Sequence, residues 1–180
     1  MLDSQTESGF FCEGCESHLD HTARFVESLL DVGESPSSGM LKNAKAWMLE
    51  HLRQLLSGDE ISQHPSIHTI TSPQVLEAQG IVTLTRMGVS TDHPILKSAL
   101  EQLKLAQQDN GSWRGNVHDT LHALEALSRI GEHIDSPTFS KAFSFIKEHV
   151  TEWPSCLGQE EHAFGQSLYM LSQITSLRKA

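Results

Sequence analysis

One helix ending recurs four times along the chain, and this repeat constrains the fold more than any other sequence feature. The copies read LLDVG (Leu29–Gly33), LTRMG (Leu84–Gly88), LSRIG (Leu127–Gly131) and LSQIT (Leu171–Thr175). Apolar residues stand three positions before and three after each leading leucine, as on one face of a helix. Three copies close with glycine, which commonly ends helices. The apolar residues three positions after the leucine are Val32, Met87, Ile130 and Ile174.

A second set of helical patterns lies between these copies. They begin near Met40, Pro94 and Thr138, and Asp, Ser or Pro residues that favour helix starts precede the last two. The sequence therefore predicts an all-α fold with a leading helix at about 18–32, followed by helix–turn–helix units. A longer loop falls at about 57–72. The alternative is an ordinary helical bundle whose segments are similar by accident.

The composition and net charge of the chain limit the kinds of partner that it is expected to bind. The chain has 180 residues, 38% of them apolar, which is enough to bury a core of ordinary size. Its 23 acidic and 13 basic residues give a net charge of −10, and no run of Lys or Arg occurs. We therefore expect neither a nucleic-acid partner nor binding to an anionic membrane surface.

The chain carries no sequence feature typical of a secreted or membrane protein. Its N-terminal sequence lacks the basic start and apolar run of a signal peptide. No apolar stretch approaches the roughly 20 residues that a membrane-spanning helix needs. Three cysteines, an odd number, argue against a disulfide framework. We expect a cytoplasmic protein with no membrane span.

The turn between two of the predicted helices carries a recognisable signature. The segments ALEQLKLAQQDNGSW (Ala99–Trp113) and HDTLHALEAL (His118–Leu127) place Gln107, Gly111 and Trp113 between two helices. This pattern resembles the repeat of squalene–hopene cyclases and protein prenyltransferase β-subunits. The resemblance implies an α/α toroid, in which inner and outer helices alternate around a central cavity.

The chain offers too few helices for a closed toroid. We therefore expect a partial α/α barrel of hairpin repeats, one domain covering residues 18–180, with 1–17 as an N-terminal segment that a bound metal could order. A homodimer would cover the apolar face that a terminal repeat leaves open. Within the turn itself, Gly111 permits a positive φ, Gln107 can reach exposed backbone groups, and Trp113 covers the junction. We expect all three to be structural.

Polar residues gather where the inner helices of such a toroid begin, and they are the candidate catalytic groups. His118 and His122 lie four residues apart on one helix face, and Asp119 can orient or charge an imidazole. We expect Asp119 to be the acid or its orienter, with His118, His122 and His162 as proton carriers and Glu161 beside them. The alternative is that the helix dipole favours these carboxylates, while His122 packs in the core and His118 is solvated.

Three more residues at the starts of these helices are candidates for binding the substrate: Asp20, Glu77 and Thr120. The loop at 57–72 has a length that suits a lid over a cavity, and it contains His64 and His68. A plain surface loop is the alternative. The expected ligand is an apolar small molecule in a cavity with a few convergent polar groups.

A separate cluster near the N-terminus has the composition of a metal site. Cys12, Cys15, His18 and His21 follow the spacing C-x₂-C-x₂-H-x₂-H, and two thiolates with two imidazoles suit tetrahedral zinc. His21 and the following threonine also resemble the His-Thr of the metal-binding helix in prenyltransferase β-subunits. The alternative is a pair of free thiols near a frayed terminus. Zinc is thus a candidate cofactor, although the expected chemistry does not require one.

Two functions from different classes fit these observations. The first is a small terpenoid-cyclase-like enzyme of natural-product biosynthesis, which holds an isoprenoid or polyene-type substrate and promotes cyclisation or isomerisation. Because no D-x-D-D motif occurs and aromatic residues make up only 6%, positioning of the substrate would carry much of the catalysis. The second is a non-catalytic helical-repeat binding module or the partner subunit of a larger enzyme.

Overall fold

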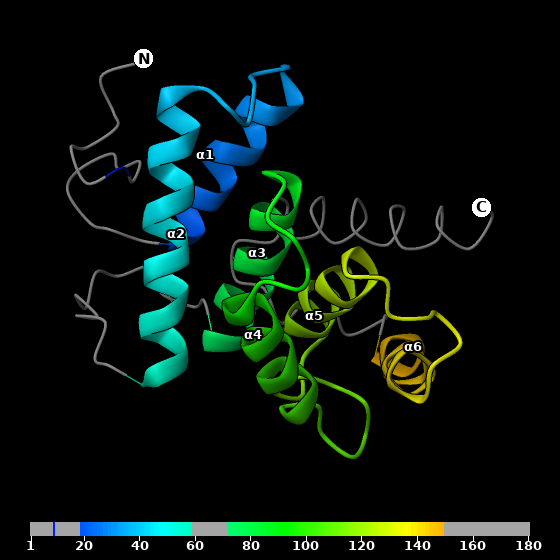
Figure 1. The fold of residues 1–180 in the computed structure, drawn as a ribbon. Helices are drawn as coiled ribbons and strands as arrows, with labels where there is room; N and C mark the ends of the chain where they lie inside the picture. Colours follow the sequence, from blue (N-terminus) through cyan, green and yellow to red (C-terminus); the bar gives the residue numbers. More distant parts are fainter. Residues whose placement is uncertain (1–8, 10–18, 59–71, 150–180) are drawn as a thin grey trace. The chain divides into compact units, whose positions relative to one another are not determined.

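The computed structural model describes residues 9, 19–58 and 72–149, and these residues are helical without any strand (Figure 1). This confirms the predicted all-α class. No helix in the described ranges is long and apolar enough to cross a membrane. The chain divides into two compact units, Met1–Gln102 and Leu103–Ala180. The helices are α1 (Leu19–Asp31), α2 (Gly39–Ser57), α3 (Pro73–Arg86), α4 (Pro94–Leu105), α5 (Val117–Arg129) and α6 (Pro137–His149).

The helix ending that recurs in the sequence also recurs in the structure. At the ends of α1, α3 and α5 the carbonyl of the leading leucine accepts a hydrogen bond from the backbone N–H five residues later. The pairs are Leu29 with Glu34 (2.9 Å), Leu84 with Val89 (3.0 Å) and Leu127 with Glu132 (3.0 Å). The glycines before these donors have φ values of 90°, 79° and 86°, which favour glycine. The predicted helix stops at Gly33, Gly88 and Gly131 are therefore confirmed.

The turns that follow are also alike. In each of the three, a backbone N–H bonds the carbonyl three residues earlier at 2.9 Å, and the next helix then begins. The pairs are Ser38 with Ser35, His93 with Ser90, and Ser136 with His133. The hairpins α1–α2, α3–α4 and α5–α6 thus share one turn design, although their sequences differ. A shared turn design argues against accidental similarity between the segments.

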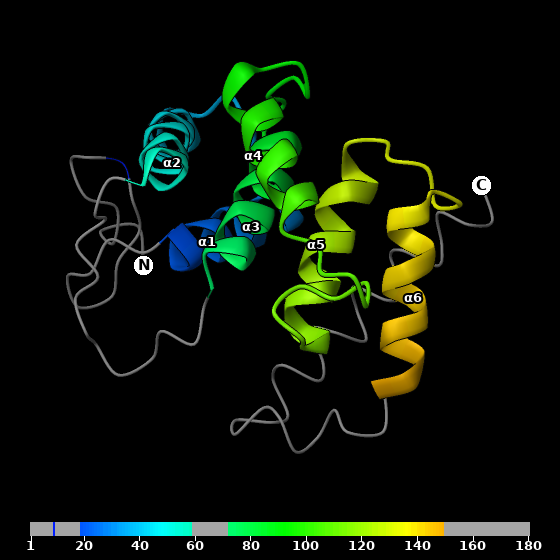
Figure 2. The same cartoon turned by 90° about the horizontal axis from the view of Figure 1, so that it is seen from below.

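Helices α1 and α3 of the first unit run parallel to each other. Their side chains pair in the same order along both helices, and Figure 2 shows the two helices beside each other with α2 to one side. The pairs are Gln79 with Asp20 (2.9 Å), Thr83 with Glu27 (2.8 Å) and Arg86 with Asp31. Parallel neighbours joined through an intervening helix are what the predicted toroid-like repeat requires. The larger toroid arrangement stays a prediction.

Helix α3 is the most buried helix of the first unit. Val75 and all residues from Glu77 to Leu84 are buried, so the buried positions occupy every side of the helix. Gly80 permits the close packing: a Cβ built there would lie 3.3 Å from a methyl carbon of Leu52 on α2 and 3.6 Å from one of Leu19 on α1. These contacts place the C-terminal half of α2 beside the N-terminal end of α1.

The signature tryptophan holds the second unit together at the turn before α5. Trp113 is fully buried, and its indole N–H donates a 2.7 Å hydrogen bond to the carbonyl of Leu103 near the end of α4. That carbonyl belongs to the last helical turn, which has no intrahelical donor. The structural role predicted for Trp113 is therefore confirmed by its contacts.

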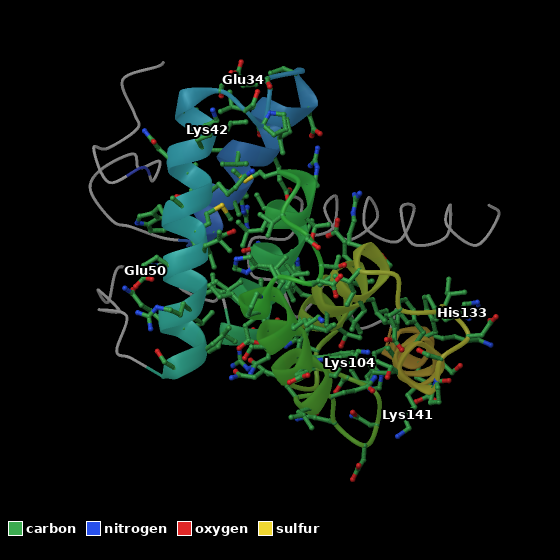
Figure 3. All side chains as sticks on the ribbon, in the orientation of Figure 1. Glu34, Lys42, Glu50, Lys104, His133 and Lys141 are labelled. Atoms are coloured by element: carbon green, nitrogen blue, oxygen red, sulfur yellow. The ribbon has the colours of Figure 1, made fainter. Side chains whose placement is uncertain are left out.

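Gln107 and Gly111 complete the same turn. The Gln107 amide donates to the carbonyl of Gly111 (3.0 Å) and to the carbonyl of Thr138 in the first turn of α6 (2.9 Å). Gly111 has a φ of 88°, and a Cβ there would overlap the carbonyl oxygen of Lys141 on α6 (labelled in Figure 3). Glycine is thus required by both conformation and space. These contacts tie the turn to α6, as expected for structural residues.

One position of the predicted apolar face is not in the core. Val32 is 81% exposed, whereas the matching Met87 is 1% exposed. Both residues stand directly after the end of their helix, α1 at Asp31 and α3 at Arg86, so the helix end itself does not explain the difference.

Candidate functional site

The start of α5 is held by side chains of the preceding turn. Asn116 is the N-cap, and its side-chain oxygen accepts the N–H of Asp119 at 2.8 Å. The Thr120 hydroxyl donates to the carbonyl of Asn116 (2.7 Å) and accepts from the N–H of Trp113 (3.1 Å). Thr120, a predicted substrate-binding residue, therefore already has structural partners. The result is a fixed first turn that positions the two residues before Thr120.

His118, Asp119 and His122 lie together on this helix, as the sequence predicted. The Nδ1 atom of His118 is 3.4 Å from Oδ1 of Asp119, and the rings of His118 and His122 meet edge to face with centroids 4.6 Å apart. Asp119 is 4% exposed and His122 is 7% exposed, while His118 is half-buried. The cluster therefore reaches from the interior towards solvent.

The electrostatics of the cluster favour an ionised Asp119. The helix N-terminus and the N–H that Asp119 donates to Asn116 both belong to the first turn, where a negative charge is stabilised. An ionised Asp119 can only accept hydrogen bonds, so the nearby Nδ1 of His118 would carry the proton and leave Nε2 as the basic nitrogen. This arrangement can hold an imidazole in one tautomer.

A second cation near Asp119 was not foreseen from the sequence. Nη1 of Arg114 lies 3.7 Å from Oδ2 of Asp119, the carboxylate oxygen that does not face His118. Arg114 also has a φ of 53°, and within the described ranges it is the non-glycine residue with positive φ. Such a conformation is unfavourable for a residue with a side chain. The adjacent Gly115 was the sequence signal for an unusual turn here.

Asp20 sits in a separate polar group in the first unit. Its Oδ1 accepts hydrogen bonds from Nε of Arg24 (2.7 Å) and from the Gln79 amide (2.9 Å), and the residue is 9% exposed. Sequence reasoning singled out Asp20 but missed Arg24 and Gln79. Arg24 follows one helical turn after Asp20, which could have been read from the sequence. The partnership with Gln79 spans 59 residues and could not.

Glu77 is the most unusual acid in the described part of the chain. It is 5% exposed, and within that part neither a hydrogen-bond donor nor a cation is paired with its carboxyl group. Burial raises the pKa of Glu77 from 4.5 to about 7. The structure places this candidate substrate-binding residue on α3, two positions before Gln79.

The predicted residues thus fall into two groups. Asp20 and Glu77 belong to the first unit, and His118, Asp119, Thr120 and His122 belong to the second. Glu161 and His162 lie outside the described residues, as do His64 and His68 of the 57–72 loop.

The predicted zinc site falls mostly outside the described residues. Cys12, Cys15 and His18 are not described, and His21 is an exposed residue of α1. Within residues 19–58 and 72–149, no group of three or more His, Cys, Asp or Glu side chains is arranged to hold a metal ion.

Comparison with known protein families, with characterised proteins and with solved structures found no match to this chain.

Proposed function

We propose that this chain is a small terpenoid-cyclase-like enzyme, which binds an apolar isoprenoid or polyene-type substrate and promotes its cyclisation or isomerisation. The observation that carries the proposal is the buried Asp119 at the start of α5, 3.4 Å from His118, with His122 against the same imidazole. The signature turn of Gln107, Gly111 and Trp113 supports the family resemblance through its contacts.

The proposed chemistry is proton transfer at carbon. Isomerisation of a double bond removes one proton and returns another. Ring closure of a polyene begins with the addition of a proton to a double bond and ends with the loss of a proton. Neutral His118 takes the proton on Nε2, and Asp119 stabilises the imidazolium that forms. His122, whose ring meets that of His118 edge to face, is the proposed second proton carrier. The site requires no metal for these steps. Cys12, Cys15, His18 and His21 remain the proposed ligands for any zinc.

The second candidate is a helical-repeat binding module or partner subunit, and the three equivalent hairpins favour it. Repeated hairpins with one turn design form extended surfaces that bind partners without chemistry. In that case Asp119 stabilises the helix start, and the histidines fill space beside it.

One set of variants distinguishes the two proposed functions. Purified protein would be incubated with a panel of linear polyprenyl and polyene substrates, and the products read by gas chromatography and mass spectrometry. Asp119→Asn and His118→Ala should each lower turnover about 100-fold or more while the circular dichroism spectrum is kept. Asp135→Asn is the control, because this side chain is 74% exposed in the α5–α6 turn.

The results of these assays distinguish the enzyme from the binding module. Turnover that survives both substitutions would remove the acid–base cluster from the mechanism. A folded protein that turns over none of the panel but still binds an apolar ligand would favour the binding module. Native mass spectrometry of the same preparation reads the proposed homodimer and any bound zinc.

A further inference from the structure

Glu77 occupies a position that two other copies of the repeat fill with threonine. The alignment of the helix endings pairs Glu77 of α3 with Thr22 of α1 and Thr120 of α5, and both threonines are fully buried. Thr120 has two hydrogen bonds that close the first turn of its helix. Glu77 has no equivalent bond among the described residues. The fold therefore accommodates a neutral, hydrogen-bonded hydroxyl here, and a carboxyl group is not needed for the turn.

Within residues 19–58 and 72–149, no group is shown to compensate a charge on Glu77. Helices α1 and α2 pack against α3, and the buried titratable groups that they bring are Asp20 and His51. Asp20 is bound to Arg24 and Gln79, and the His51 ring stacks on Trp47 with centroids 4.6 Å apart. Neither group contributes to the raised pKa of Glu77, which burial alone explains.

The helix that carries Glu77 is closely packed. Its neighbours from Ala78 to Leu84 are all buried, and Gly80 holds α3 within van der Waals contact of Leu52 and Leu19. An uncompensated buried charge strongly disfavours the packed state, so ionisation must either be suppressed or be accompanied by local opening.

We infer that Glu77 is a pH-sensitive element of the first unit, whose deprotonation loosens the packing of α3 against α1 and α2 in neutral and alkaline solution. The sign follows from proton linkage. The folded pKa of about 7 lies above the ordinary value of 4.5, so the folded state holds the proton more tightly than the unfolded state. Stability from this group is fully present below about pH 4.5 and is lost as the pH rises through 7.

The test uses the full chain and two neutral variants. The melting temperature of the wild type and of Glu77→Gln is measured from pH 5 to pH 8. The wild type should lose on the order of 5 °C more than Glu77→Gln over this range. Glu50→Gln is the matched control, because Glu50 lies on the side of α2 turned away from α3 (Figure 3) and its carboxylate bonds Arg53. It should follow the wild-type pH dependence.

A direct measurement covers the case in which Glu77→Gln does not fold. The side-chain carboxyl carbon of Glu77 in the wild type is followed by carbon-13 NMR as the pH is raised, and a midpoint near 7 supports the inference. A midpoint near 4.5, or parallel melting curves for the wild type and Glu77→Gln, would overturn it. Hydrogen exchange of the α3 amides, corrected for intrinsic rates, should be faster at pH 8 than at pH 6 only when Glu77 is present.

Discussion

The side-chain amide of Gln79 donates a 2.9 Å hydrogen bond to the carboxylate of Asp20, and this bond joins α3 to α1. Both residues are buried, and Arg24 is the other donor to the same carboxylate oxygen. The bond also orients Gln79, because a flipped amide would turn its oxygen towards the carboxylate. Its amide oxygen is then left without a hydrogen-bond partner among the described residues.

Replacing Gln79 with Leu should therefore destabilise the first unit. A buried hydrogen bond to a charged group is worth about 1.5–3 kcal/mol, and Asp20 would keep only Arg24. Urea denaturation measures the free energy of unfolding. The matched control is Gln54→Leu, which removes an amide–carboxylate bond of 3.0 Å to exposed Glu50. Equal losses of unfolding free energy in the two variants would show that the buried hydrogen bond between α1 and α3 contributes no more than an exposed one.

Two glycines separate conformational strain from steric overlap. Gly111 and Gly88 have φ values of 88° and 79°, but a Cβ at Gly111 would overlap the Lys141 carbonyl whereas one at Gly88 meets nothing within 4 Å. Gly88→Ala should cost about 1–2 kcal/mol, the penalty for a left-handed conformation. Gly111→Ala should cost clearly more, because the turn must move away from α6. Thermal unfolding of both variants checks the order, and a reversed order would contradict the turn geometry.

The indole bond of Trp113 gives a third prediction. Trp113→Phe keeps an aromatic ring but leaves the carbonyl of Leu103 without its 2.7 Å donor. Loss of the bond should cost about 1–3 kcal/mol, and the smaller ring adds a cavity term. Trp47→Phe on α2, where the ring is half-buried, should cost less. Chemical denaturation followed by circular dichroism compares the two, since both variants lose one tryptophan.

Arg114 combines an unfavourable backbone conformation with a positive charge beside Asp119, and substitution with glycine removes both. Glycine adopts a φ of 53° without penalty, so Arg114→Gly should keep or raise stability by up to about 1 kcal/mol. The 3.7 Å pair with Asp119 is half-exposed and contributes little to folding. If the enzyme proposal holds, turnover falls in Arg114→Gly and recovers in Arg114→Lys. A loss of stability in Arg114→Gly would show that the guanidinium holds the turn.

The repeat, the helix ends and the signature turn could be read from the sequence because their signals are local. A leucine, an apolar residue three positions on and a glycine are enough to end a helix, and the Schellman-type bonds at Leu29, Leu84 and Leu127 follow. The grouping of His118, Asp119 and His122 was equally accessible, since residues one and four apart on a helix are neighbours by geometry. The failure at Val32 marks the limit, because the equivalent Met87 also follows its helix end and is nevertheless buried, so burial at this position depends on what packs over it.

Contacts between helices were decided only by the tertiary structure. The bond between Asp20 and Gln79 depends on α1 and α3 running parallel at one register, which no local pattern encodes. The burial of Glu77 has the same origin: its sequence neighbours look like those of an ordinary helix start, and its low exposure depends on how α3 packs against other helices. The sequence by itself thus determined where helices begin and end and which side chains share a helix face. The tertiary structure decided which acids are paired, which is buried alone and which cation approaches Asp119, because desolvation and pairing depend on segments distant in the chain.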